Sequence, residues 1–220
     1  EAYKTLRTNV SFSLTGEEAS KVILVTSSLQ SEGKSITAVN LAISYAQTDR
    51  RVLLIDCDLR RPKLARLLQA NSPVGLSNVL MDPSLMNEAV ISTGLPNLDV
   101  VLSGDIPPNP SELLSSPRMA SLLENLKKQY DMIILDTPPI NMVIDAVVLS
   151  PLTEGVLFVV RANRAERGAV IHAVEQLEYA KAKILGFVLN GVGLESTRYG
   201  YDKHRYRRSS GSYHRYGYHG

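Results

Sequence analysis

The sequence predicts an α/β fold of the doubly wound type, in which helices flank a mostly parallel β-sheet. Short apolar runs alternate along the chain with helical patterns. The runs are continuously apolar, as strands buried on both faces of a parallel sheet require. In addition, Gly33-Lys34-Ser35 lies between the first run and a helix. Ligands are therefore expected beyond the carboxyl ends of the strands.

The elements are expected in a regular order. A helix over residues 1–14 carries Leu6, Val10 and Leu14 at helical spacing. A strand over 21–26 precedes the Gly-Lys-Ser stretch, and a helix over 36–47 follows it. The remaining elements are a strand at 52–56, a helix at 62–68, a strand at 98–102, a helix at 117–129, strands at 132–136 and 156–160, a helix at 166–179 and a strand at 184–190.

Composition favours one soluble domain. At 220 residues and 44% hydrophobic, the chain can bury a full core. No apolar run approaches the roughly 18 residues that would cross a bilayer, and no signal-peptide pattern is present. Glu1 in place of Met is consistent with a fragment whose preceding part carries a membrane segment. The single cysteine, Cys57, excludes an intrachain disulfide, fits a reducing compartment and is expected to be a small buried filler.

The last 22 residues differ from the rest of the chain. Residues 199–220 carry five basic groups against Asp202, a balance of +4, which leaves −2 for residues 1–198. Almost no aliphatic side chain is present there to build a core. We therefore expect a domain over 1–198 and a flexible tail over 199–220. Interleaved aromatic and basic residues would suit RNA or lipid, and a solvated end is the simpler interpretation.

Residues 28–35 form the expected phosphate cradle. Backbone N–H groups at a helix start would face the β-phosphate, Lys34 would reach the β/γ-phosphates, and the Ser35 hydroxyl would bind Mg²⁺. Ser28 replaces the first glycine of the usual pattern. The nucleotide-binding residues expected here are Ser31, Glu32, Gly33, Lys34, Ser35 and Ile36.

Two carboxylate motifs follow apolar runs. In the first, extended backbone would point Asp56 and Asp58 to one side, where two like charges need a cation such as Mg²⁺, with Arg60 close by. In the second, Asp136 ends a strand and Thr137-Pro138-Pro139 follows, as in a Walker B motif. For either motif the simpler interpretation is a strand-ending Asp that caps a turn.

These three motifs resemble the Walker A, Walker A′ and Walker B motifs of bacterial tyrosine kinases, P-loop NTPases of the partitioning-ATPase-like branch that act in polysaccharide synthesis and export. Glu1, Lys4 and Arg7 resemble the family's Glu-x-x-Arg-x-x-Arg oligomerisation helix, with Lys4 departing from Arg. Residues 107–113 also look like a family segment. The resemblance extends over nearly the whole chain.

The resemblance implies autophosphorylation with ATP and Mg²⁺. Lys34 and the 33–35 amides would hold the β/γ-phosphates, and Ser35, Asp58 and Asp136 would hold Mg²⁺ directly or through water. Asp56 would orient or deprotonate the tyrosine, Arg60 would neutralise the transferring group, and Asn190 would contact adenine. The implied phosphoacceptors are Tyr199, Tyr201, Tyr206, Tyr213, Tyr216 and Tyr218.

The implied partners are further copies of the chain in a ring such as an octamer, a transmembrane activator or polysaccharide co-polymerase domain, a tyrosine phosphatase and other protein substrates. The implied location is the cytoplasm, at the inner face of the membrane. The alternative is a partitioning or division-site ATPase that binds DNA or membrane. Leu29 stands where those proteins carry a signature lysine, so nucleic acid is not an expected partner. A small-molecule ligase has only fold analogy behind it.

Overall fold

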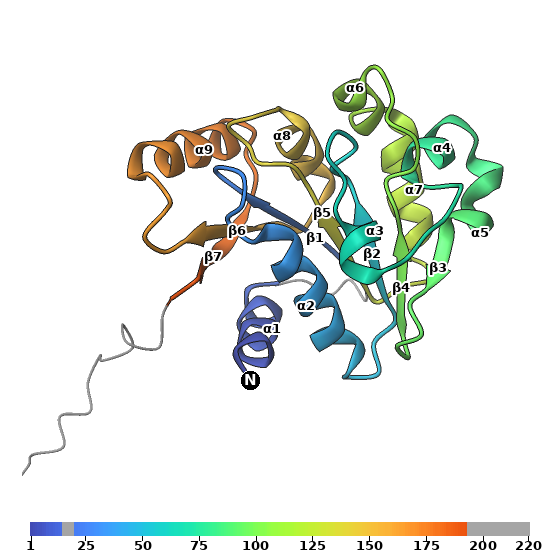
Figure 1. Cartoon of the computed structure of the whole chain (residues 1–220), viewed down its shortest axis with the longest axis horizontal. Helices are drawn as coiled ribbons and strands as arrows, with labels where there is room; N and C mark the ends of the chain where they lie inside the picture. Colours follow the sequence, from blue (N-terminus) through green and yellow to red (C-terminus); the bar gives the residue numbers. More distant parts are fainter. Residues whose placement is uncertain (15–19, 193–220) are drawn as a thin grey trace, which may run out of the picture.

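A seven-stranded β-sheet forms the centre of the computed structural model, which describes residues 1–14 and 20–192 (Figure 1). The strand order is β3-β4-β2-β5-β1-β6-β7, and only the β3–β4 pairing is antiparallel. The predicted doubly wound α/β fold is therefore confirmed. The strands are β1 (Lys21–Ser27), β2 (Val52–Asp56), β3 (Val90–Ser92), β4 (Leu98–Val101), β5 (Met132–Asp136), β6 (Gly155–Arg161) and β7 (Ile184–Asn190).

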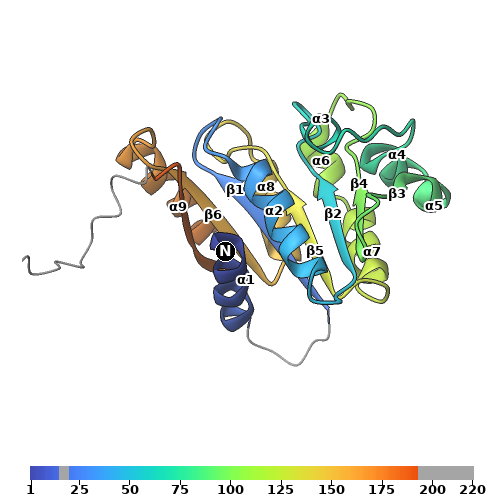
Figure 2. The same ribbon diagram turned by 60° about the horizontal axis from the view of Figure 1, so that its bottom comes forward.

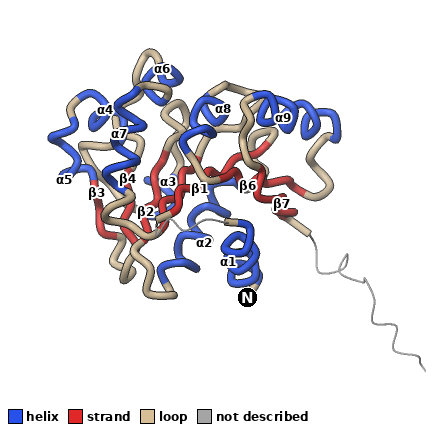
Figure 3. The backbone as a smooth tube through the Cα atoms, turned by 180° about the vertical axis from the view of Figure 1, so that it is seen from behind, coloured by secondary structure: helices blue, strands red, loops and turns tan. Residues whose placement is uncertain are grey.

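Helices cover both faces of the sheet (Figures 2 and 3). One face packs against α1 (Ala2–Ser13), α2 (Lys34–Ala46) and α3 (Leu64–Leu68). The other packs against α4 (Leu76–Met81), α5 (Met86–Ala89), α6 (Pro110–Leu114), α7 (Pro117–Leu126), α8 (Asp145–Leu149) and α9 (Arg167–Tyr179). Successive β1 residues enter the two cores in turn, with Ile23 in one and Leu24 in the other. This two-sided burial explains why the strands are continuously apolar.

Each element expected from the sequence is present, and its ends differ from the expectation by at most three residues. The sequence did not predict β3, α4, α5, α6, α8 or the 3₁₀ turns at Pro83–Leu85 and Ser150–Leu152. Each of these has six residues or fewer, which is too short for an amphipathic repeat to identify it.

The sheet brings the motifs together at one edge. Strands β2, β5, β1, β6 and β7 are adjacent and parallel, so their carboxyl ends form a row. Asp56 lies opposite Asp136 in the register of β2 and β5, and Arg161 lies opposite Asn190 in that of β6 and β7. The cradle that follows β1 lies between these two pairs.

Cys57 is fully buried in the core, as expected. The predicted tail, and with it the domain boundary at residue 198, lies outside the described residues. Within residues 1–14 and 20–192, no helix combines the length and the apolar character that crossing a bilayer demands.

Candidate active site

The cradle requires glycine at one position. Gly33 has φ +98°, in the left-handed region, and a Cβ there would collide with the Asn190 side chain. Ser31 also adopts a positive φ, 65°. Lys34 is the first residue of α2, so the N-terminal N–H groups of this helix face the same space as its amine.

The buried Glu32 carboxylate stabilises the cradle through hydrogen bonds. It accepts them from the Ser28 hydroxyl (2.8 Å) and the Leu29 N–H (2.7 Å). Arg161, at the end of β6, donates its backbone N–H to Glu32 (3.4 Å) and its guanidinium to the Ser31 carbonyl (2.9 Å). Ser28, the departure from the usual glycine, thus supplies a hydrogen bond that fixes the loop.

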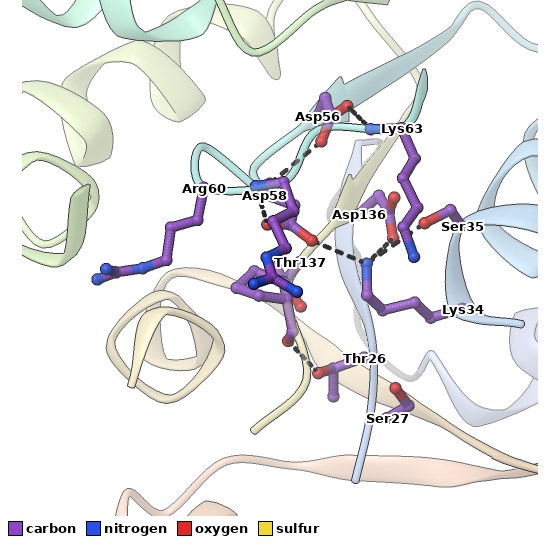
Figure 4. A network of polar contacts seen from close by, with 12 residues as sticks. Thr26, Ser27, Lys34, Ser35, Asp56, Asp58, Arg60, Lys63, Asp136 and Thr137 are labelled. Carbon is purple, nitrogen blue, oxygen red and sulfur yellow. Dashed lines mark hydrogen bonds and ion pairs between the residues drawn. The ribbon is translucent and has the colours of Figure 1, made fainter. Parts of the chain in front are cut away.

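Lys34 lies between two carboxylates (Figure 4). Its Nζ is 3.3 Å from Asp58 Oδ2 and 3.4 Å from Asp136 Oδ1, and it is 3.3 Å from the Ser35 hydroxyl. All of these side chains are nearly inaccessible to solvent. The three Walker motifs predicted from the sequence therefore meet at one amine.

The oxygen atoms around Lys34 suit a magnesium ion that binds together with a nucleotide phosphate. Asp136 Oδ2 is buried and has no hydrogen-bond partner among the described residues, and burial raises the pKa of this carboxyl. A nearby cation would pair that oxygen and favour its charged form. In residues 1–14 and 20–192 there is no cluster of three His, Cys, Asp or Glu that could hold a metal alone. Mg²⁺ characteristically completes such a site with substrate phosphates and water.

Asp56 is held by the backbone. Its Oδ1 accepts from the Asp58 N–H (3.1 Å), and its Oδ2 accepts from the N–H groups of Lys63 (3.1 Å) and Leu64 (3.0 Å). Burial, and then the nearby Asp136 charge, raise the pKa of Asp56 to about 7. These contacts shape the loop between β2 and α3, and they do not leave Asp56 open to an incoming hydroxyl.

Arg60 is directed away from Lys34 (Figure 4). Its guanidinium donates to Asp145 Oδ2 (3.0 Å) and to the Ser111 hydroxyl (2.9 Å). Ser111 in turn donates to Asp145 Oδ1 (2.6 Å), and Asp145 is fully buried. The structure therefore does not bring Arg60 to the phosphate cradle.

Two hollows open on either side of Lys34. The first, of about 380 Å³, contains the cradle and ends at the strand termini of β6 and β7; it is lined by Ser31, Gly33, Lys34, Ser35, Ile36, Lys63, Arg66, Leu67, Arg161, Asn190 and Gly191. The second, of about 330 Å³, has an apolar wall after β5; it is lined by Gln30, Lys34, Asp58, Arg60, Arg61, Lys63, Pro138, Pro139, Met142 and Val143. The Thr26 hydroxyl, bonded to the Pro138 carbonyl (3.0 Å), holds that wall against β1.

The remaining predicted residues lie as follows. Asn190 donates to the Glu32 carbonyl (2.9 Å) and so reaches the cradle. On α1, Lys4 pairs with Glu1 (3.0 Å) on an exposed face, and Arg7 donates to the Ser44 carbonyl of α2. Within one chain, therefore, Arg7 supports the packing of α1 on α2.

Sequence reasoning missed several residues that line or support the site: Lys63, Asp145, Ser111 and Arg161. Arg161 could have been found, because it directly follows the strand predicted at 156–160, and it ends β6, which is the neighbour of β1. Asp145 belongs to a short helix that no pattern indicated, and Ser111 lies in the segment 107–113, for which the family resemblance gave no function.

Comparisons with known proteins agree with this geometry. The family model described as AAA domain matches residues 20–185. Tyrosine-protein kinase YwqD of Bacillus subtilis (strain 168) is 42% identical over 202 residues, which cover 91% of this chain and 85% of YwqD. The putative tyrosine-protein kinase EpsB of Ralstonia nicotianae is 34% identical over 99% of this chain, which corresponds to 28% of EpsB.

Solved structures show the same likeness. The kinase domain of Escherichia coli tyrosine kinase ETK superposes with a TM-score of 0.83 at 34% identity, over 99% of this chain and 79% of that one. The septum site-determining protein MinD of Pyrococcus horikoshii, complexed with Mg-ADP, shares the fold at 22% identity (TM-score 0.66, 77% of this chain and 70% of MinD). From the identity to YwqD and the meeting of the three Walker motifs at Lys34, this chain belongs to the bacterial tyrosine-protein kinases and is a protein-tyrosine kinase with a P-loop fold.

Proposed function

We propose that this kinase transfers the γ-phosphoryl group of MgATP to tyrosines of its own C-terminal cluster, and thereby regulates capsule or exopolysaccharide synthesis or export. The observation that carries the proposal is the buried Lys34 amine held between Asp58 and Asp136 at the mouth of two hollows. One hollow suits a nucleotide and the other suits an acceptor side chain.

The hollow that contains the cradle is the proposed nucleotide site. The backbone N–H groups at Gly33, Lys34 and Ser35 would hold the β-phosphate, with Ser31, Glu32 and Ile36 shaping the loop. Asn190 at the far end of this hollow would meet the adenine. Mg²⁺, when bound, would be held by Ser35, Asp58 and Asp136 and would neutralise charge on the β- and γ-phosphates.

The second hollow is the proposed tyrosine site. Its wall of Pro138, Pro139 and Met142 would contact the ring, and Asp58 would face the hydroxyl. In the transfer, the bond from the γ-phosphorus to the bridging oxygen breaks and ADP keeps the electron pair. The tyrosine oxygen then bonds to phosphorus, and its proton passes to water. The Asp56 oxygens accept backbone N–H groups, so we assign loop support to Asp56. Asp58 accepts the Arg61 N–H and pairs with Lys34, so we assign to it the positioning of Lys34 and of Mg²⁺.

The proposed acceptors are the six tail tyrosines from Tyr199 to Tyr218. We further propose that the chain forms a homo-oligomeric ring through α1, with Glu1, Lys4 and Arg7 exchanging their in-chain partners for a neighbouring copy. A transmembrane activator or co-polymerase domain would recruit it from the cytoplasm to the membrane. The match to only 28% of EpsB supports this, since a kinase region of this kind also occurs within a longer protein. A tyrosine phosphatase would reverse the reaction, and other proteins would serve as further substrates.

The test is labelling of purified, dephosphorylated protein with MgATP, read by an anti-phosphotyrosine blot. Lys34→Met and Asp136→Ala should each reduce labelling at least about 100-fold, because each removes a group that stabilises charge in the transition state. Lys128→Met, an exposed lysine after α7, is the matched control and should label normally. Normal labelling of Lys34→Met protein would refute the assignment.

A further inference from the structure

Lys63 lies between the two hollows of the active site. Among the residues that line them, only Lys34 and Lys63 are shared by both. Lys34 was expected from the cradle pattern, whereas nothing in the sequence singled out Lys63. A cation in this position faces the path of a group that passes from nucleotide to acceptor.

The backbone fixes where Lys63 can reach. Its N–H is bonded to Asp56 Oδ2 (3.1 Å), and α3 begins at the next residue. The side chain is half-buried, and Figure 4 shows it running from the Asp56 end of the loop toward Ser35 and Lys34. Asp56 thus anchors a lysine whose amine lies over the cradle.

The charged groups next to Lys34 do not by themselves attract an anionic nucleotide. Lys34 is paired with both Asp58 and Asp136, so these three groups together carry no positive excess when the carboxylates are ionised. A triphosphate remains anionic with one Mg²⁺ bound, and these three groups alone would not attract it.

Each of the other cations near the site either makes hydrogen bonds to the protein or lines only one of the two hollows. Arg60 is held by Asp145, and Arg161 donates to the Ser31 carbonyl. Arg66 lines the nucleotide hollow only, and Arg61 lines the acceptor hollow only. Lys63 lines both hollows and forms no ion pair with any carboxylate in the described parts of the chain.

We propose that Lys63 is a second phosphate-binding lysine, which contacts the γ-phosphate of ATP at the boundary of the two hollows. This inference rests on the proposed nucleotide site. It assigns to Lys63 the recognition of ATP over ADP, since only ATP carries the phosphate at the boundary of the two hollows. The competing interpretation is a solvated surface lysine with no ligand.

The test compares binding of a non-hydrolysable ATP analogue and of ADP, each with Mg²⁺, by displacement of a fluorescent nucleotide. For Lys63→Met, affinity for the analogue should fall about 10-fold and affinity for ADP less than about 2-fold, because one charge-assisted hydrogen bond is lost. Lys63→Arg should recover most of the loss. Lys128→Met, which changes the net charge equally, should bind both nucleotides as the wild type does.

Each other outcome overturns a defined claim. If Lys63→Met binds both nucleotides like the wild type, or loses affinity for both equally, the γ-phosphate contact is refuted. If the wild type itself binds neither nucleotide, the proposed function fails instead. Melting temperatures of the nucleotide-free variants identify any loss that comes from unfolding, and Lys63→Gln then replaces Lys63→Met in the same comparison.

Discussion

Asp56 has three roles in the folded chain. It ends a strand, it caps the loop that carries Lys63, and it adds negative charge beside Asp136. Three backbone N–H groups favour its ionised form, but burial and the Asp136 charge outweigh them, so its pKa rises to about 7. The metal-free protein therefore holds a proton there that the unfolded chain loses at much lower pH.

This shift predicts how the metal-free protein responds to pH. Between the ordinary value of 3.8 and about 7, the folded state binds more protons at Asp56 than the unfolded state does. The contribution of this group to the free energy of unfolding therefore falls as pH rises through that window, and it levels off above it. Urea titrations in EDTA at several pH values give the free energy of unfolding of the wild type and of Asp56→Asn, and the wild-type value minus the variant value measures the contribution of Asp56. If this difference grows with pH, the raised pKa is contradicted.

The site residues differ in how far the sequence could predict them. Asp136 ends a strand, and Lys34, Ser35 and Asp58 follow strands, at the positions where the fold class alone places ligands. The direction of Arg60 could not be predicted, because its partner Asp145 is 85 positions away in an unrecognised helix. A motif indicates which residues gather, whereas long-range partners decide where each side chain points.

The short helices α6 and α8 both contribute hydrogen-bond partners to Arg60 of the Walker A′ loop. Ser111 of α6 and the buried Asp145 of α8 hold the Arg60 guanidinium, which leaves the loop fixed at the rim of the acceptor hollow. This gives a structural role to the segment over residues 107–113, whose family resemblance was noted without a function. These hydrogen bonds connect the Walker A′ loop with α6 and α8, which are far from it in the sequence.

Asp145→Asn should weaken this network. It removes the charge that pairs with Arg60, and we expect a loss of about 2 kcal/mol in unfolding free energy, from hydrogen bonds to charged groups discounted for the partial exposure of Arg60. Tyrosine phosphorylation should slow while nucleotide affinity stays unchanged, since the contact borders the acceptor hollow only.

Ser111→Ala tests the same network more gently, with an expected loss of about 1 kcal/mol. Ser115→Ala, at the exposed residue that follows α6, is its control and should leave stability unchanged. Equal stabilities for Ser111→Ala and Ser115→Ala in urea would show that the network does not stabilise the loop.

At the scale of the whole molecule, sheet order creates the site. The residues that gather around Lys34 come from positions 28–35, 56–63 and 136–143, and they meet because β2, β5 and β1 are neighbours in the sheet. The alternation of elements predicted a parallel sheet, but it did not specify this order. The order depends on which faces pack together, a property of the folded chain that no local pattern records.

The most direct test of the account is phosphopeptide mapping after dephosphorylated protein is incubated with MgATP. In the wild type, phosphate should appear on peptides that contain the tail tyrosines from Tyr199 to Tyr218, because the Lys34 site is proposed to act on them. A Lys34→Met protein should carry none there. Tail phosphorylation of equal extent in both proteins, or a wild type phosphorylated on none of these tyrosines, would contradict the account.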